Sequence, residues 1–204
     1  MKKSIILLCT VLFCFTVNAQ FSVGPKAGLN IGKEKYGNNF YTTSSHVFFC
    51  GGIFANYSLK KHFATQLEVI YSGEGTRESY PANNKTITGV VTINRINIPV
   101  LFQYKTSAGI YLETGPQIGF LISAKGKYST GNYNFKTNTQ PSLFSWCFGA
   151  GYQLSQTVPG LGISARYAAG LSQVNKGKVN GNSIKSNVFA ITLFYALPCK
   201  TKAK

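Results

Sequence analysis

The chain has 204 residues, enough for one domain, and its 21 lysines and arginines against five acidic residues give a formal net charge of +16. Its 21 glycines, 12 tyrosines and 15 phenylalanines, with only 13% charged residues, favour an all-β chain. Beyond residue 17 no apolar stretch is long enough for a helix to cross a bilayer, which excludes a helical membrane protein but not a barrel of strands.

The first nineteen residues predict a secretory signal peptide. A basic start at residues 1–3 is followed by an apolar run over 5–17, and Val17 and Ala19 occupy positions −3 and −1 of a cut before Gln20. A membrane anchor is the alternative, but the run is shorter than the ~20 apolar residues that a spanning helix needs. We therefore expect cleavage after Ala19.

Alternation of apolar and polar residues begins directly after this segment and predicts half-buried strands. In the first strand, the odd positions from Phe21 to Ile31 are apolar, alanine or proline, and the even positions are glycine or polar. Similar segments recur along the chain. The eight predicted strands cover residues 21–32, 46–59, 62–74, 89–105, 109–124, 143–156, 161–173 and 186–197. The eighth is apolar on both parities, and its predicted outward face is Phe189, Ile191, Leu193, Tyr195 and Leu197.

The fourth predicted strand is irregular. Val91 and Ile93 are out of phase with the apolar face that starts at Ile96, so we expect a β-bulge or a break near Asn94. Pro99 lacks the backbone donor that a ladder uses and is the weakest point of this strand.

Connections of two lengths alternate along the chain. Long polar segments, read as loops, cover residues 33–45, 75–88, 125–142 and 174–185, and short turns separate the other strands. Long loops at one end and short turns at the other are typical of outer-membrane barrels. The predicted fold is therefore an eight-stranded antiparallel up-and-down transmembrane β-barrel over residues 20–197, with a basic tail over 198–204.

In a membrane barrel the apolar face meets lipid and the polar face lines the lumen. The polar face here is rich in glycine and holds a few large charged groups, while aromatic residues near strand ends suit interfacial girdles. The predicted lumen network consists of Lys26, Glu68, Arg95, Glu113 and Arg166. An ion-pair network that fills the lumen is favoured over acid–base chemistry by the two carboxylates, because eight strands leave room only for side chains.

No catalytic residue, metal site or cofactor is predicted. His46 and His62 are expected at opposite ends of their strands, and the absence of aspartate excludes a Ser-His-Asp triad. No cysteine or histidine spacing resembles a zinc site. Cys50 and Cys147 lie in predicted strands, where buried thiols are favoured, and a bridge between them stays open.

Removal of Lys2 and Lys3 with the signal peptide lowers the charge from +16 to +14. The remaining lysines are scattered between strands rather than grouped on one helix, and an exported chain rarely meets nucleic acid, so no nucleic-acid partner is expected. The expected partners are outer-membrane lipid and lipopolysaccharide, together with the barrel assembly machinery and periplasmic chaperones. The sequence does not indicate a specific loop partner.

Several short motifs, in this order and spacing, resemble the PorT-like family of small outer-membrane β-barrel proteins. They are Gly24–Asn30, Gln66–Ser72, Ile96–Leu101, Tyr111–Pro116, Gly149–Tyr152 and Arg166–Leu171. The resemblance implies an eight-stranded barrel in a Gram-negative outer membrane and provides no catalytic residue. One departure is the chain end, where Pro198, Cys199 and a basic tail follow the last aromatic strand.

Together these features predict a non-enzymatic outer-membrane barrel with a structural or loop-mediated binding role. Two alternatives stay open. A small outer-membrane enzyme would need Ser, His and carboxylate groups close together at one rim, and a soluble periplasmic carrier of the lipocalin type would turn the apolar face inward.

Overall fold

A computed structural model describes residues 20–35, 42–82, 85–154, 158–176 and 185–198. The predicted signal peptide over 1–19 and the basic tail after Pro198 lie outside these residues. Within the described ranges, no helix is long and apolar enough to cross a membrane.

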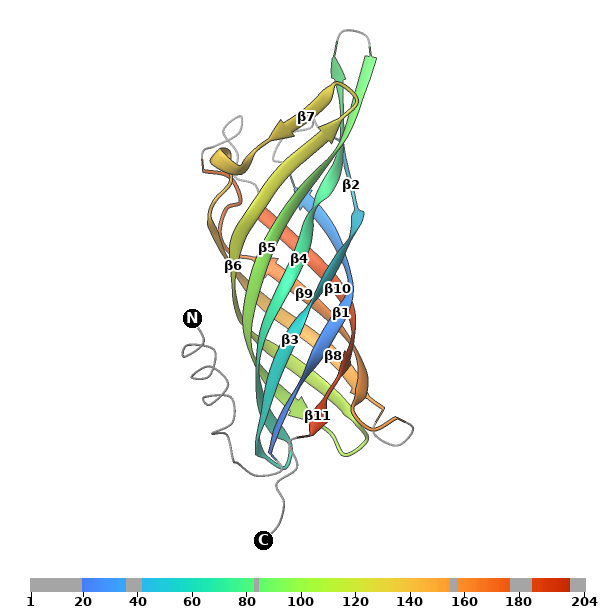
Figure 1. The fold of residues 1–204 in the computed structure, drawn as a ribbon, viewed down its shortest axis with the longest axis vertical. Helices are drawn as coiled ribbons and strands as arrows, with labels where there is room; N and C mark the ends of the chain where they lie inside the picture. Colours follow the sequence, from blue (N-terminus) through green and yellow to red (C-terminus); the bar gives the residue numbers. More distant parts are fainter. Residues whose placement is uncertain (1–19, 36–41, 83–84, 155–157, 177–184, 199–204) are drawn as a thin grey trace, which may run out of the picture.

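Long antiparallel strands close into a single tilted ring (Figure 1). Its eight members are β1 (Phe21–Lys35), β3 (His46–Lys60), β4 (Phe63–Ala82), β5 (Lys85–Lys105), β6 (Ile110–Tyr128), β8 (Ser142–Gln153), β9 (Leu161–Gly170) and β10 (Lys185–Tyr195). Each pairs with the next one along the chain, and β10 pairs with β1. This confirms the predicted up-and-down barrel, in which closure leaves no long unpaired edge.

Three short strands extend the ring. Both β2 (Thr42–Ser44), which pairs with β4, and β7 (Gly131–Asn134), which pairs with β6, lie at the end with the long connections. At the opposite end, β11 (Leu197–Pro198) pairs with β1 directly after β10. The first and last strands of the ring therefore start and finish at the same end of the barrel.

The faces of the strands are inverted relative to those of a water-soluble barrel. Leu29, Phe49 and Phe102 on the outward face are exposed, whereas Lys26, Glu68 and other polar groups on the inward face are buried. The outward face predicted for the last strand is correct, because those residues are exposed while Val188 and Thr192 are buried. An apolar exterior around a polar interior is the arrangement that lipid requires.

The predicted loops at 75–88 and 125–142 are wrong over most of their length. β4 runs on to Ala82 and pairs in register with β5 from Lys85 onward, and this hairpin rises beyond the rest of the barrel (Figure 1). β6 continues to Tyr128 and is followed by β7 and the 3-10 turn η1 (Lys136–Asn138). Strands that leave the bilayer no longer need an apolar face, so the alternation that marks a strand in the sequence disappears while backbone pairing continues.

The other two predicted loops are partly described. β1 continues to Lys35 and β2 lies within the predicted loop at 33–45, whose residues 36–41 are outside the described ranges. In the loop at 174–185, Asn175 forms a β-bridge with Thr139 and β10 already begins at Lys185. Residues 177–184 lie outside the described ranges.

The irregularity expected in β5 near Asn94 lies instead in its partner strand, β6. The pairing of β5 with β6 shifts register where Asn94 pairs with Ser123 and Arg95 with Leu121, so the extra residue belongs to β6. β5 itself alternates without a break, and Val91 and Ile93 face the lumen in the same phase as Arg95. Pro99 does not end the strand, because its register opposite β6 is the same as that of Phe102, three residues on.

Candidate functional site

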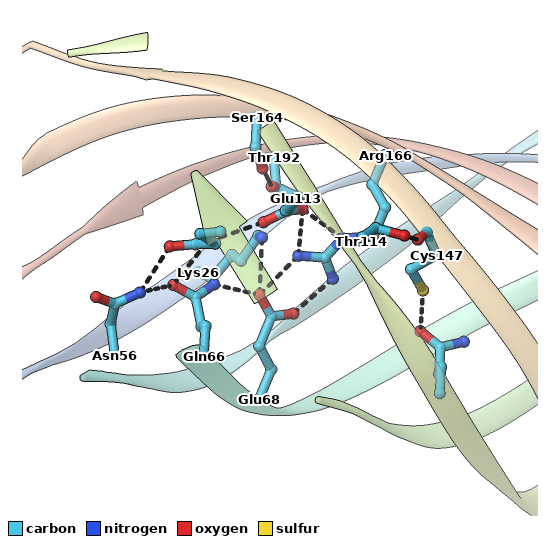
Figure 2. Close-up of polar contacts among 12 residues, drawn as sticks. Lys26, Asn56, Gln66, Glu68, Glu113, Thr114, Cys147, Ser164, Arg166 and Thr192 are labelled. Carbon is cyan, nitrogen blue, oxygen red and sulfur yellow. Dashed lines mark hydrogen bonds and ion pairs between the residues drawn. The ribbon is translucent and has the colours of Figure 1, made fainter. Parts of the chain in front are cut away.

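Four charged side chains from four different strands meet inside the barrel, and Figure 2 shows them pointing toward one another. Arg166 on β9 donates from Nη1 to Oε2 of Glu68 on β4 and from Nη2 to Oε1 of Glu68, both at 2.7 Å. Its Nε donates to Oε1 of Glu113 on β6, also at 2.7 Å. Lys26 on β1 donates from Nζ to Oε1 of Glu68 at 3.1 Å. Two cations and two carboxylates therefore neutralise one another in a buried cluster, called the lumen quartet below.

A glycine makes room for this cluster. Gly149 on β8 pairs with Glu113 on one side and with Arg166 on the other. A Cβ atom at position 149 would lie 2.8 Å from Oε1 of Glu113 and 2.9 Å from the carbonyl oxygen of Ala165. The absence of a side chain at this position allows the ion pair between Glu113 and Arg166 to cross β8.

Side-chain amides continue the network toward the end with the short turns. Gln66 donates to Oε1 of Glu68 at 2.6 Å, and Gln103 donates to Oε2 of Glu113 at 3.0 Å. Asn56 donates to the side-chain oxygens of Gln66 and Gln103 at 2.9 and 2.7 Å. Both carboxylates of the lumen quartet therefore accept hydrogen bonds beyond their ion pairs, as buried charges require.

A second carboxylate level lies toward the opposite end. Glu74 accepts hydrogen bonds at Oε1 from Oγ of Ser72 at 2.9 Å and from Nδ2 of Asn97 at 2.8 Å. Sequence reasoning missed Glu74 as a lumen residue, although it shares the inward parity of Glu68 on the same strand. The structure also separates Arg95 from the lumen quartet, since its guanidinium donates to the backbone carbonyl of Gln140 at 3.4 Å. Four of the five predicted lumen residues are thus brought together, and Arg95 is not.

An apolar cluster lies farther along the lumen, beyond Arg95. It consists of Val91, Ile93, Ala124, Leu143 and Val174, with Leu121, Tyr128 and Phe135 packed against it. Between this cluster and the amides, the cavity beside the lumen quartet measures about 50 Å³. That space is large enough for a few water molecules and much smaller than the ~150 Å³ cavity that accepts a benzene molecule.

The histidines and cysteines do not form a reactive group in the described residues. His46 begins β3 and packs on Phe48 with a centroid distance of 4.9 Å, whereas His62 follows the far end of β3, roughly 45 Å along the strand at ~3.3 Å per residue. Cys50 and Cys147 are separate buried thiols. Within the described residues, no three histidine, cysteine or acidic side chains gather around a possible metal position.

A family profile described as an outer membrane protein beta-barrel domain matches residues 17–176. The chain belongs to this family. Among solved structures, this outer-membrane barrel is similar to Ail, the attachment invasion locus protein of Yersinia pestis, at 15% identity and a TM-score of 0.50, covering 87% of this chain and 99% of Ail. It is also similar to Neisserial surface protein A, at 15% identity and a TM-score of 0.50, covering 86% and 96% of the two chains. At this identity the likeness shows the fold alone. None of the curated proteins compared with the chain matches it.

The charged residues of this outer-membrane barrel are segregated by sign. All four glutamates whose side chains the structure describes are buried, at 1% to 5% exposure. Exposed cationic side chains lie instead at the two rims. At the rim with the long hairpins they are Arg77, Lys125, Lys127, Lys136, Lys176 and Lys185, and at the opposite rim they include Lys60 and Lys61. Over the described residues, the exposed charge of the barrel is therefore positive.

Proposed function

We propose that this protein is a non-enzymatic outer-membrane barrel whose lumen is structural and whose outer rim binds anionic groups at the cell surface. The separation of charges by sign supports this proposal, because the described glutamates are buried inside the barrel and the exposed charged side chains at the rims are cations. Lipopolysaccharide phosphates are the proposed partners of the outer rim. Membership of the PorT-like group within the family, based on the motifs quoted above, belongs to the same proposal.

The lumen favours a structural role over transport or carriage. The lumen quartet, the amides and the apolar cluster fill most of the interior, and eight strands enclose little space beyond their own side chains. A lipocalin-like carrier needs an apolar interior, and the inward face of this barrel is polar along most of its length. No contact among the described residues favours an enzyme at the rim.

The outer rim presents its cations close to the apolar exterior. Lys125 and Lys127 are exposed on β6, opposite Asn134 and Asn132 of β7. Both lysines lie a few residues after Ile122, an exposed apolar residue on the same strand. A lysine at this height meets the phosphate level of the outer leaflet, where each cation contributes ~1 kcal/mol of attraction.

Titration of refolded mature protein with lipopolysaccharide in zwitterionic micelles tests this proposal. Replacing Lys125 and Lys127 together with glutamine is expected to weaken binding by roughly ten- to thirtyfold, from ~1 kcal/mol for each cation. The matched control, Lys60→Gln with Lys61→Gln, removes the same charge from the other rim and should leave this affinity unchanged. Equal effects of both pairs, or stepwise ion conductance of the protein in a planar bilayer, would contradict the proposal.

Export with removal of the first nineteen residues is part of the proposal. The intact mass of the protein extracted from outer membranes is expected to correspond to residues 20–204. A mass that retains the apolar run over residues 5–17 would contradict cleavage after Ala19.

A further inference from the structure

A second cationic feature lies at the rim with the short turns, where the turn between β3 and β4 meets the end of β5. A cavity of about 260 Å³ opens there, lined by Ser58, Lys60, Lys61, His62, Phe63 and Lys105 among others. One water molecule needs only ~10–15 Å³ in the same measure, so this space can accept a small polar group. The short turns, together with the start of β1 and the end of β11, mark this rim as the periplasmic one.

The described residues that line the cavity include three lysines and no carboxylate. Lys60 and Lys61 are exposed, whereas Lys105 donates from Nζ to Oδ1 of Asn56 at 2.8 Å and so joins the lumen network. Nδ1 of His62 lies 2.9 Å from the carbonyl oxygen of Lys105. Because a carbonyl only accepts, Nδ1 carries a proton, and this bond fixes the orientation of the ring. The described carboxylates nearest in the network are buried deeper in the lumen, so an anion entering the cavity meets no repelling group on its walls.

The backbone around the cavity is already held in place. The amide of Ser58 donates to the carbonyl of Gln20 at 2.8 Å, and the amide of Lys105 donates to the carbonyl of His62 at 2.7 Å. These bonds tie the start of β1, the β3–β4 turn and the end of β5 together. A ligand would therefore bind without ordering this part of the chain, which lowers the cost of binding.

Apolar and aromatic side chains adjoin the cations on the outer surface. Phe63 is 55% exposed and Tyr104 is 46% exposed, and their rings meet edge to face at 5.4 Å. Leu59, beside Lys60, is 50% exposed. The cavity thus joins a positive rim to the lipid-facing belt, and an anion that carries acyl chains can use both.

We propose that this cavity binds the phosphate of an anionic phospholipid in the periplasmic leaflet, with Lys60 and Lys61 contacting the phosphate and Phe63 contacting the acyl chains. The inference rests on the membrane setting of the proposed function but not on lipopolysaccharide binding at the other rim. A free phosphate would use the lysines alone, so the contribution of Phe63 separates the two sources of the anion.

The test is a lipid titration of the full mature protein in zwitterionic micelles, followed by native mass spectrometry. Phosphatidylglycerol is expected to bind at least tenfold more tightly than phosphatidylcholine, and Lys60→Gln with Lys61→Gln should remove this preference. Phe63→Ala should weaken binding of phosphatidylglycerol several-fold. The control pair Lys125→Gln and Lys127→Gln, which tests the lipopolysaccharide proposal, should leave phosphatidylglycerol binding unchanged.

Three results would overturn the inference. They are equal affinity for the two lipids, a preference that survives loss of both lysines, and displacement of phosphatidylglycerol by an equal concentration of inorganic phosphate. A double-lysine variant that failed to fold would be recognised by loss of its heat-modifiable band. Single substitutions of each lysine, expected to lose part of the preference, would then replace it, and an undiminished preference in both would overturn the inference.

Discussion

Glu68 connects more partners than any other carboxylate described in the lumen. It accepts from Arg166, Lys26 and Gln66 at distances between 2.6 and 3.1 Å, so its charge is balanced and its oxygens are occupied. Buried ion pairs add little net stability relative to apolar residues, because desolvation offsets the attraction. Removing one partner is different, since the remaining charges stay buried without compensation.

The substitution Glu68→Gln is therefore expected to destabilise the barrel by ~3–5 kcal/mol, because Lys26 would lose its carboxylate partner and Arg166 would keep only Glu113. Urea unfolding in detergent micelles measures this change. Lys127→Gln, an exposed charge removal of similar size, is the control and is expected to shift stability by less than ~0.5 kcal/mol. Similar effects of the two substitutions would contradict the proposed role of the lumen quartet.

A second prediction at this scale concerns the glycine beside the ion pair. Gly149→Ala places a methyl group 2.8 Å from Oε1 of Glu113 and 2.9 Å from the backbone of Ala165, so the ion pair has to shift. We expect a loss of ~1–3 kcal/mol in the same unfolding assay. Ala150→Val, the neighbour on the outward face, serves as the control and should be nearly neutral. A neutral Gly149→Ala would show that the crossing is less tightly packed than the structure indicates.

The sequence predicted part of this site. Strand parity alone placed Lys26, Glu68, Glu113 and Arg166 on the lumen side, and the structure brings them to one level. Parity could not give the position of Arg95 along the barrel axis. That position depends on the tilt of the strands and on the register shift in the pairing of β5 with β6, which set the residues that face one another across the lumen. Strand parity also places Glu74 and Gly149 on the inward face. Their contacts depend on the pairing register of the strands, which the sequence does not give.

At the scale of elements, the longest strands reach well beyond the apolar belt. β4 and β5 pair up to Ala82 and Lys85, and the inward Glu78 of this extension accepts a hydrogen bond from Tyr128 on β6 at 2.8 Å. The sequence predicted the membrane-embedded part of each strand within a few residues. It did not predict the extensions, because polar residues on both faces are compatible with either a loop or a solvated strand.

Hydrogen exchange tests these extensions. Backbone amides over residues 76–80 and 87–92 are expected to be protected by at least tenfold relative to an unstructured loop, since each lies within the paired register of β4 and β5. The amides of Ser107 and Ala108, exposed in the turn between β5 and β6, provide a reference in the same sample. Exchange over residues 76–80 as fast as in that turn would contradict the strand extension and favour the loop predicted from the sequence.

The whole molecule is organised by the position of its polar groups. Among the described residues, charged side chains either lie buried inside the ring, where four of them neutralise one another, or lie as cations at its two rims, and the surface between the rims is apolar. The composition of the chain, rich in glycine and aromatics with few acids, already indicates this organisation. Alternation alone did not distinguish a membrane barrel from a soluble one, because both have one apolar and one polar face. The exposure of the apolar face in the closed ring makes the distinction.

A nitroxide scan along β4 in lipid vesicles tests most directly whether the apolar face of the barrel meets lipid. Single cysteines replace residues 64–71, except Glu68, in a chain whose native Cys50, Cys147 and Cys199 are replaced by alanine. We predict strong collision with oxygen in the bilayer at Leu67, Val69 and Tyr71, which are exposed, and weak collision at Ala64, Gln66 and Ile70, which are buried. The opposite phase, or collision with a water-soluble nickel reagent at the exposed positions, would contradict a barrel that faces lipid with its apolar side.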